Sequence, residues 1–146
     1  MEETTPQLLP ETNSKRPNLL TILCILTFVG SGLNLFSSIM VAAFFDQFAV
    51  LAQDFGEKFN LPGMELFLEA KPLYFLASAL GYAIAITGAI MMFRLKKIGF
   101  HIYTTAQILL ILVPMYFFHM SGPSILDIIL SGTFVILYST NLKIMN

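Results

Sequence analysis

The sequence is poor in cysteine and in charged residues, and both shortages exclude classes of protein. Cys24 is the only cysteine among 146 residues, so one chain can form neither a disulfide nor a cysteine-based metal cluster. Charged residues make up 12% of the chain, about half the usual share in a soluble domain. The net charge of −1 leaves no basic surface for nucleic acid.

Motifs of several enzyme classes are also missing. The chain has no Cys-x-x-Cys or His-Glu-x-x-His motif, no Gly-x-Ser-x-Gly motif, no P-loop and no glycine-rich dinucleotide motif. We therefore predict no catalytic residue, no metal site and no cofactor, and we expect that the protein is not an enzyme.

Long apolar runs dominate what is present. There are four of them: Leu19–Phe45, Leu73–Phe93, Ile98–Phe118 and Ile125–Tyr138. All but the last have at least 21 residues, whereas about 20 suffice to cross the hydrocarbon layer as a helix. We predict an all-α fold, a membrane-embedded antiparallel four-helix bundle. The transmembrane domain is 19–146, with spans at about 19–45, 73–93, 98–118 and 124–142, behind a polar tail at 1–18.

The uneven distribution of Lys and Arg predicts the orientation. Six of them flank the spans on one side: Lys15, Arg16, Arg94, Lys96, Lys97 and Lys143. Only Lys58 and Lys71 fall on the other side. Because cytoplasmic loops are enriched in Lys and Arg, we expect both termini, including the tail, to be cytoplasmic. The segment Asp46–Lys71 is then an outer loop.

This outer loop is amphipathic in its first half. Its apolar residues fall at helical spacing, with the charged residues largely on another face: Phe48, Leu51, Ala52, Phe55 and Phe59. The pattern predicts a short amphipathic helix at the outer interface, or an upward extension of the first span. A docking surface for a partner and a lid over a cavity are the functional alternatives.

Small residues recur every four positions in the first two spans. The second span has Ala77, Gly81, Ala85 and Ala89, and the first has Gly30, Asn34, Ser38 and Ala42. Small residues let helices approach closely in lipid. We predict that these two stripes pack together, or that one of them faces a second copy of the protein.

Asp127 is the only acidic residue within an apolar run. Ser124-x-x-Asp127 matches a capping box at a helix start, where a carboxylate also meets the positive end of the helix dipole. The alternative is a proton or cation site, because acids within membranes are commonly functional. A pair of Asp127 with His119 is conceivable, but two ligands make a weak metal site.

Asn34 and Gln107 are the deeper polar residues of the spans. Hydrogen bonds between helices would explain both of them. The alternative is that they line a polar pathway through the membrane.

The start of the first span carries a resemblance. Arg16-Pro17-Asn18-Leu19-Leu20-Thr21, followed by Leu26-Thr27-Phe28-Val29-Gly30-Ser31-Gly32, resembles the opening of some small bacterial four-span membrane proteins of unknown function. The resemblance implies a bacterial cytoplasmic (inner) membrane protein. It implies no catalytic residue, ligand or partner.

These features favour the first of two functions, because the chain is rich in packing motifs and poor in reactive groups. The first is a non-catalytic accessory protein that acts by association, either as a homo-oligomer or with another membrane protein. The second is a small oligomeric transporter or channel component whose route is lined by Asn34, Gln107 and Asp127. In both cases we expect the lipid bilayer to be a partner of the protein, because it surrounds the four spans.

Overall fold

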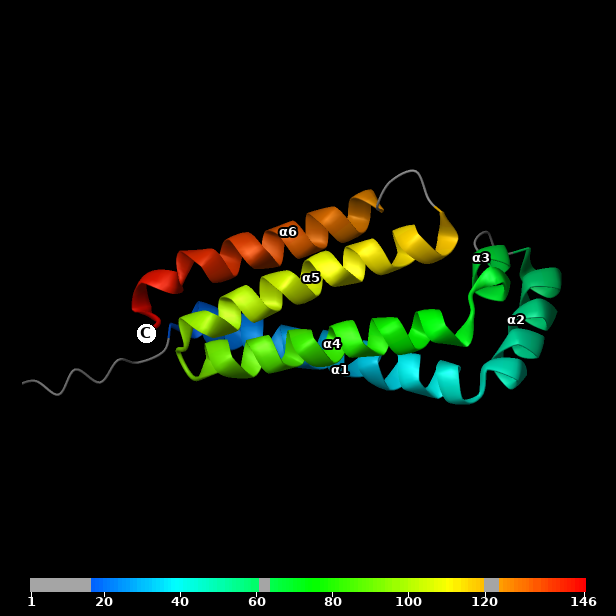
Figure 1. Ribbon diagram of the computed structural model, residues 1–146, viewed down its shortest axis with the longest axis horizontal. Helices are drawn as coiled ribbons and strands as arrows, with labels where there is room; N and C mark the ends of the chain where they lie inside the picture. The colour runs from blue at the N-terminus through cyan, green and yellow to red at the C-terminus, as the bar shows by residue number, and fades with distance from the viewer. Residues whose placement is uncertain (1–16, 61–63, 120–123) are drawn as a thin grey trace, which may run out of the picture.

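The computed structural model describes residues 17–60, 64–119 and 124–146 and is helical, with no strand in these ranges (Figure 1). The elements are α1 (Asn18–Ala43), α2 (Phe45–Phe59), α3 (Met64–Glu69), α4 (Pro72–Phe93), α5 (Lys97–Phe118), α6 (Ile125–Thr140) and the 3₁₀ turn η1 (Leu142–Ile144). Nearly all of the polar tail at 1–18 lies outside the described residues.

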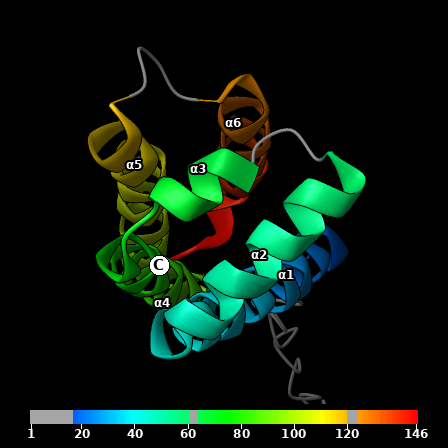
Figure 2. The same cartoon turned by 90° about the vertical axis from the view of Figure 1, so that its right-hand side faces the viewer.

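Four of these helices are long and apolar enough to cross a membrane: α1, α4, α5, and α6 extended by η1. They run antiparallel in a bundle, so the predicted fold class is confirmed. Seen along the bundle, α4 lies between α1 and α5, and α6 lies diagonally across from α4 (Figure 2). Contacts are extensive between α4 and both of its neighbours and sparse around α6. The end that carries α2 and α3 is called the outer end below, and the opposite end the inner end.

The chain turns sharply where the first span was expected to continue to residue 45. α1 ends at Ala43, Phe44 leaves the helical conformation (φ −119°, ψ 37°), and α2 begins at Phe45. α2 then runs across the axis of the spans at the outer end (Figures 1 and 2). The amphipathic outer helix is therefore confirmed, and an upward extension of α1 is wrong. α3 adds a second short helix beside it.

Glycine sets the closest approach between spans. A Cβ on Gly88 of α4 would lie 2.7 Å from the Tyr103 backbone nitrogen of α5, and one on Gly99 of α5 would lie 2.6 Å from the Gly88 carbonyl oxygen. α4 and α5 thus pack backbone against backbone, as small residues allow in lipid. Gly81 faces Leu110 of α5.

The stripe on α4 is turned toward its neighbours, but the stripe on α1 is only partly so. Ala85 and Ala89 are fully buried, and the Cys24 thiol of α1 donates to the Ala89 carbonyl oxygen. On α1, Ser38 is buried, whereas Gly30 has open space where a Cβ would be. The buried face of α1 consists of Leu20, Leu23, Cys24, Thr27, Ser38 and Val41, of which only Ser38 belongs to the stripe.

Tight packing is concentrated in the inner half of the bundle. The buried cluster consists of Leu20, Leu23, Cys24, Ala85, Met92, Tyr103, Ala106, Tyr138 and Met145. The C-terminal residues cover its end, because Asn146 pairs with the α4–α5 turn through Asn146 N to Leu95 O and Lys97 N to Asn146 O, each 2.8 Å. The outer half of α6 is exposed from Ser124 to Leu130. The bundle is therefore closed at its inner end and looser toward its outer end.

Candidate functional site

A polar pocket of about 210 Å³ lies between the four spans. Every span contributes to its lining, which consists of Leu26, Thr27, Gly30, Ser31, Asn34, Tyr82, Tyr103, Gln107, Leu130, Ser131 and Phe134. None of these lining residues carries a charge. The pocket therefore offers hydroxyl and amide groups against an apolar background.

The pocket lies near the middle of the four long apolar helices. Tyr82 and Gln107 are at the midpoints of α4 and α5, and the α1 residues of the pocket surround the midpoint of that helix. α1 has 26 residues, or about 39 Å of helix, so Asn34 lies within the hydrocarbon layer of about 30 Å. Polar groups at this depth need partners, because lipid supplies none.

Asn34 and Gln107, the two deeper polar residues singled out in the sequence, line this same pocket. The Ser131 hydroxyl of α6 donates to Gln107 Oε1 of α5 at 2.8 Å. Asn34 Nδ2 donates to the Gly30 carbonyl oxygen of its own helix at 2.8 Å, and the Asn34 side chain is exposed. Gln107 thus forms a hydrogen bond between helices, whereas Asn34 is anchored within α1.

Two tyrosines separate the pocket from the inner end. The hydroxyl groups of Tyr138 and Thr27 are 2.8 Å apart and join α6 to α1. The Tyr138 ring also packs edge-on against the Tyr103 ring of α5, with centroids 5.0 Å apart. Because Tyr138, Tyr103 and Thr27 are all buried, they form a plug on the inner side of the pocket.

Asp127 lies outside the lining of the pocket, so the three predicted polar positions do not all converge. It is exposed, one helical turn outward from Ser131 on α6.

Ser124 and Asp127 occupy the positions of the predicted capping box, but its side-chain hydrogen bond is not formed. Ser124 is the N-cap residue of α6 and Asp127 lies in the first turn. The backbone alone begins the helix there, through Ile128 N to Ser124 O. Within the described ranges, no three His, Cys, Asp or Glu side chains come together as a metal site.

Several residues of the pocket were not singled out from the sequence. Thr27 and Ser31 lie on the same face of α1 as Asn34, and Ser131 follows Asp127 by one turn. Polar residues at helical spacing on two spans were the available signal. Tyr82 and Tyr103 could not be recognised as pocket residues from the sequence, because tyrosine is also common at membrane interfaces.

No protein-family model matches this chain, and no curated protein or solved structure matches it either. Four helices apolar enough to span a bilayer make it a multi-pass membrane protein. Its role is therefore inferred from the pocket.

Proposed function

We propose that the protein is a component of a small oligomeric transporter or channel that passes a small uncharged polar solute. One observation carries this proposal: Asn34, Gln107 and Ser131 line a single pocket near mid-depth of the four spans. Substrate sites of membrane transporters commonly lie at this depth, where the protein replaces the hydration shell of the solute.

The chemistry of the lining favours a neutral solute over an ion. An ion at mid-depth requires an opposite charge or several carbonyl ligands, and the lining holds no charged residue. Amide and hydroxyl groups can both donate and accept hydrogen bonds. A volume of about 210 Å³ accommodates several water molecules or one solute of a few non-hydrogen atoms.

The exposed side chain of Asn34 supports an oligomeric state. An amide facing acyl chains at this depth is unfavourable, and no residue of the described chain covers Asn34 fully. A second copy packed against the side of α1 and α6 would shield it and complete the wall of the pocket.

The same proposal includes the cellular setting. The charge bias supports a cytoplasmic location of both termini, and the resemblance of the first span supports the cytoplasmic membrane of a bacterium and a group of four-span proteins of unknown function. The pocket would then be closed on the cytoplasmic side by the tyrosine plug.

Solute flux into proteoliposomes tests the proposal. Stopped-flow light scattering is recorded with glycerol and with urea for the parent protein and for Gln107→Leu, which keeps the size of the side chain but removes its amide. We expect flux above that of protein-free vesicles for the parent, and a fall of at least tenfold for Gln107→Leu.

Thr105→Val provides the matched control. Thr105 lies on the same helix, is exposed and bonds only to the His101 carbonyl oxygen of α5, so its replacement should leave flux unchanged. Equal flux for Gln107→Leu and Thr105→Val, or no flux of either solute through the parent, would contradict the proposal.

A second candidate is a non-catalytic accessory protein that acts by association, and the open half of α6 favours it. Ile125, Leu126 and Ile129 are each more than half exposed, and α6 has the smallest buried share of the four spans. A photo-crosslinker at Ile129 should then capture a membrane protein partner, whereas one at buried Tyr138 should not. A strict monomer by native mass spectrometry in mild detergent, with no crosslinked product, would exclude this candidate.

A further inference from the structure

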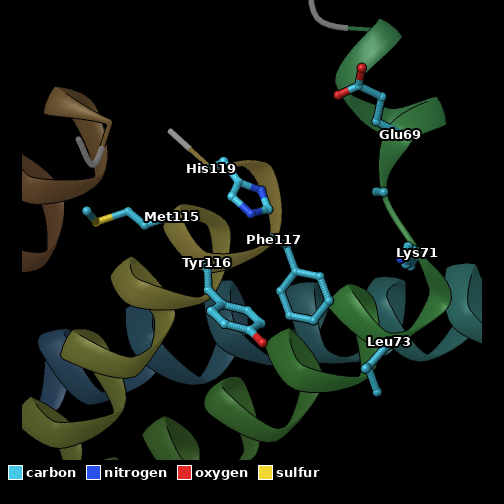
Figure 3. A pocket seen from close by; sticks show the side chains of 8 residues that line it. Glu69, Lys71, Leu73, Met115, Tyr116, Phe117 and His119 are labelled. Atoms are coloured by element: carbon cyan, nitrogen blue, oxygen red, sulfur yellow. The ribbon is translucent and has the colours of Figure 1, made fainter. Parts of the chain in front are cut away.

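A second pocket, of about 540 Å³, lies at the outer end of the bundle. It is formed between the α3–α4 connection and the last turn of α5 (Figure 3). It lies at the first turn of α4 and the last turn of α5. Because these are the ends of two membrane spans, the pocket lies at the level of the lipid head groups.

The upper part of this pocket carries charges of both signs. Glu69, the last residue of α3, and Lys71, which precedes α4, lie on one side of it. His119, which follows α5, lies on the other side (Figure 3). A carboxylate and an ammonium group two residues apart match a ligand that carries both an ammonium group and an anion.

The lower part is apolar and continues along the spans. Leu73 and Phe117 contribute apolar side chains to it, and Leu73 is 61% exposed. Tyr116 is 79% exposed, with a ring suited to the boundary between head groups and acyl chains. One site therefore combines a polar upper part with an apolar lower part, which is the layout of a phospholipid.

We propose that this pocket binds the head group of a zwitterionic phospholipid that has a primary ammonium, as in phosphatidylethanolamine. Lys71 pairs with the phosphate, and the Glu69 carboxylate accepts hydrogen bonds from the ammonium. The acyl chains run along Leu73 and Phe117. A choline head group has no N–H to donate, so Glu69 discriminates against it. This proposal is independent of the solute pocket.

Native mass spectrometry of the full chain tests it. The protein in mild detergent is mixed with equal amounts of phosphatidylethanolamine, phosphatidylcholine and phosphatidylglycerol that have identical acyl chains. We expect the ethanolamine lipid to be retained about threefold more than the choline lipid, the effect of one exposed ion pair. Glu69→Gln should abolish this preference, and Lys71→Ala should lower the retention of all three lipids.

Matched controls lie in the same outer segment. Glu65→Gln changes an acid on the same helix, and Lys58→Ala changes a cation of α2; neither residue lines this pocket. Both variants should retain the ethanolamine preference. Glu69→Lys serves as a second variant and should shift the preference to the anionic phosphatidylglycerol. No ethanolamine preference in the parent, or the same loss in Glu65→Gln as in Glu69→Gln, would overturn the proposal.

Discussion

Gly88 of α4 and Gly99 of α5 are the residues at which two spans come closest. The atoms nearest to a Cβ on Gly88 are the backbone nitrogen and Cα of Tyr103 and the carbonyl oxygen of Gly99. Backbone atoms cannot move aside as a flexible side chain can. Any side chain at Gly88 must therefore push α5 away from α4, with Tyr103 and the plug that it forms.

We expect Gly88→Ala to lower the free energy of unfolding by about 1–3 kcal/mol, as overpacking of a tight interface does. Thermal unfolding in detergent can be followed with a thiol-reactive dye, because Cys24 is the only cysteine and is buried. Gly30→Ala is the control: no atom lies within 4 Å of a Cβ there, and alanine favours helix by about 1 kcal/mol. Equal unfolding midpoints for the two variants would contradict the packing described.

Polar residues of one type have different roles in these spans. Thr87, Thr105 and Thr133 each donate to a carbonyl oxygen of the preceding turn of their own helix. Thr27, in contrast, pairs with Tyr138 of another helix. The sequence gives the same residue type in all four places, and only the rotation of each helix decides which hydroxyl reaches a neighbour.

At the scale of elements, the environment of α2 can be inferred from the spacing of its apolar residues. None of its residues is buried in the chain, although Phe48, Leu51, Phe55 and Phe59 lie on one side. Phe48, Leu51 and Phe55 line a groove together with Met64 and Phe67 of α3. With α2 across the outer end (Figure 2), the remaining apolar surface can be covered by the interface of the bilayer, as in other amphipathic helices.

Tryptophan replacements on the two faces of α2 test this placement, since the chain has no tryptophan of its own. Phe55 and Val50 are about 140° apart on the helix. We expect Phe55→Trp to be quenched by brominated lipid and shielded from iodide, and Val50→Trp to behave in the opposite way. Equal quenching of both by iodide would show that α2 stands clear of the membrane.

At the scale of the whole molecule, the bundle is asymmetric along its axis. Its inner half holds the buried cluster and the docked C-terminal residues, while its outer half contains the exposed turns of α6. The pocket near the middle of the spans has the tyrosine plug on its inner side and an incompletely covered wall at Asn34. The orientation of the chain therefore determines which side of the membrane the plug faces.

Charge replacement in the α4–α5 turn tests the orientation. A fluorescent protein fused to the C-terminus should be fluorescent in a bacterial host, because the predicted location of this terminus is cytoplasmic. Replacement of Arg94, Lys96 and Lys97 by Gln should give a mixed orientation, whereas replacement of Lys58 and Lys71 should not. Activity of alkaline phosphatase fused at the same terminus of the parent would contradict the assignment.

The helices themselves could be predicted from the sequence with little error. α4 and α5 begin one residue before the predicted boundaries and end at them, because hydrocarbon requires every backbone group to be bonded within its own helix. The end of the first span was misplaced at residue 45. Phe44 and Phe45 are apolar, and hydropathy does not distinguish a helix that continues from one that turns.

The sequence by itself determined that four apolar segments span a bilayer, that an amphipathic helix follows the first of them, and that Asn34 and Gln107 lie deep. The physical reason is that the preference of a segment for hydrocarbon over water depends on the hydrophobicity of that segment alone. Only the tertiary structure decided that Asn34, Gln107 and Ser131 share one pocket while Asp127 lies outside its lining. That outcome depends on the rotation and closeness of the helices, which the contact between Gly88 and Gly99 and the pairing of Thr27 with Tyr138 establish.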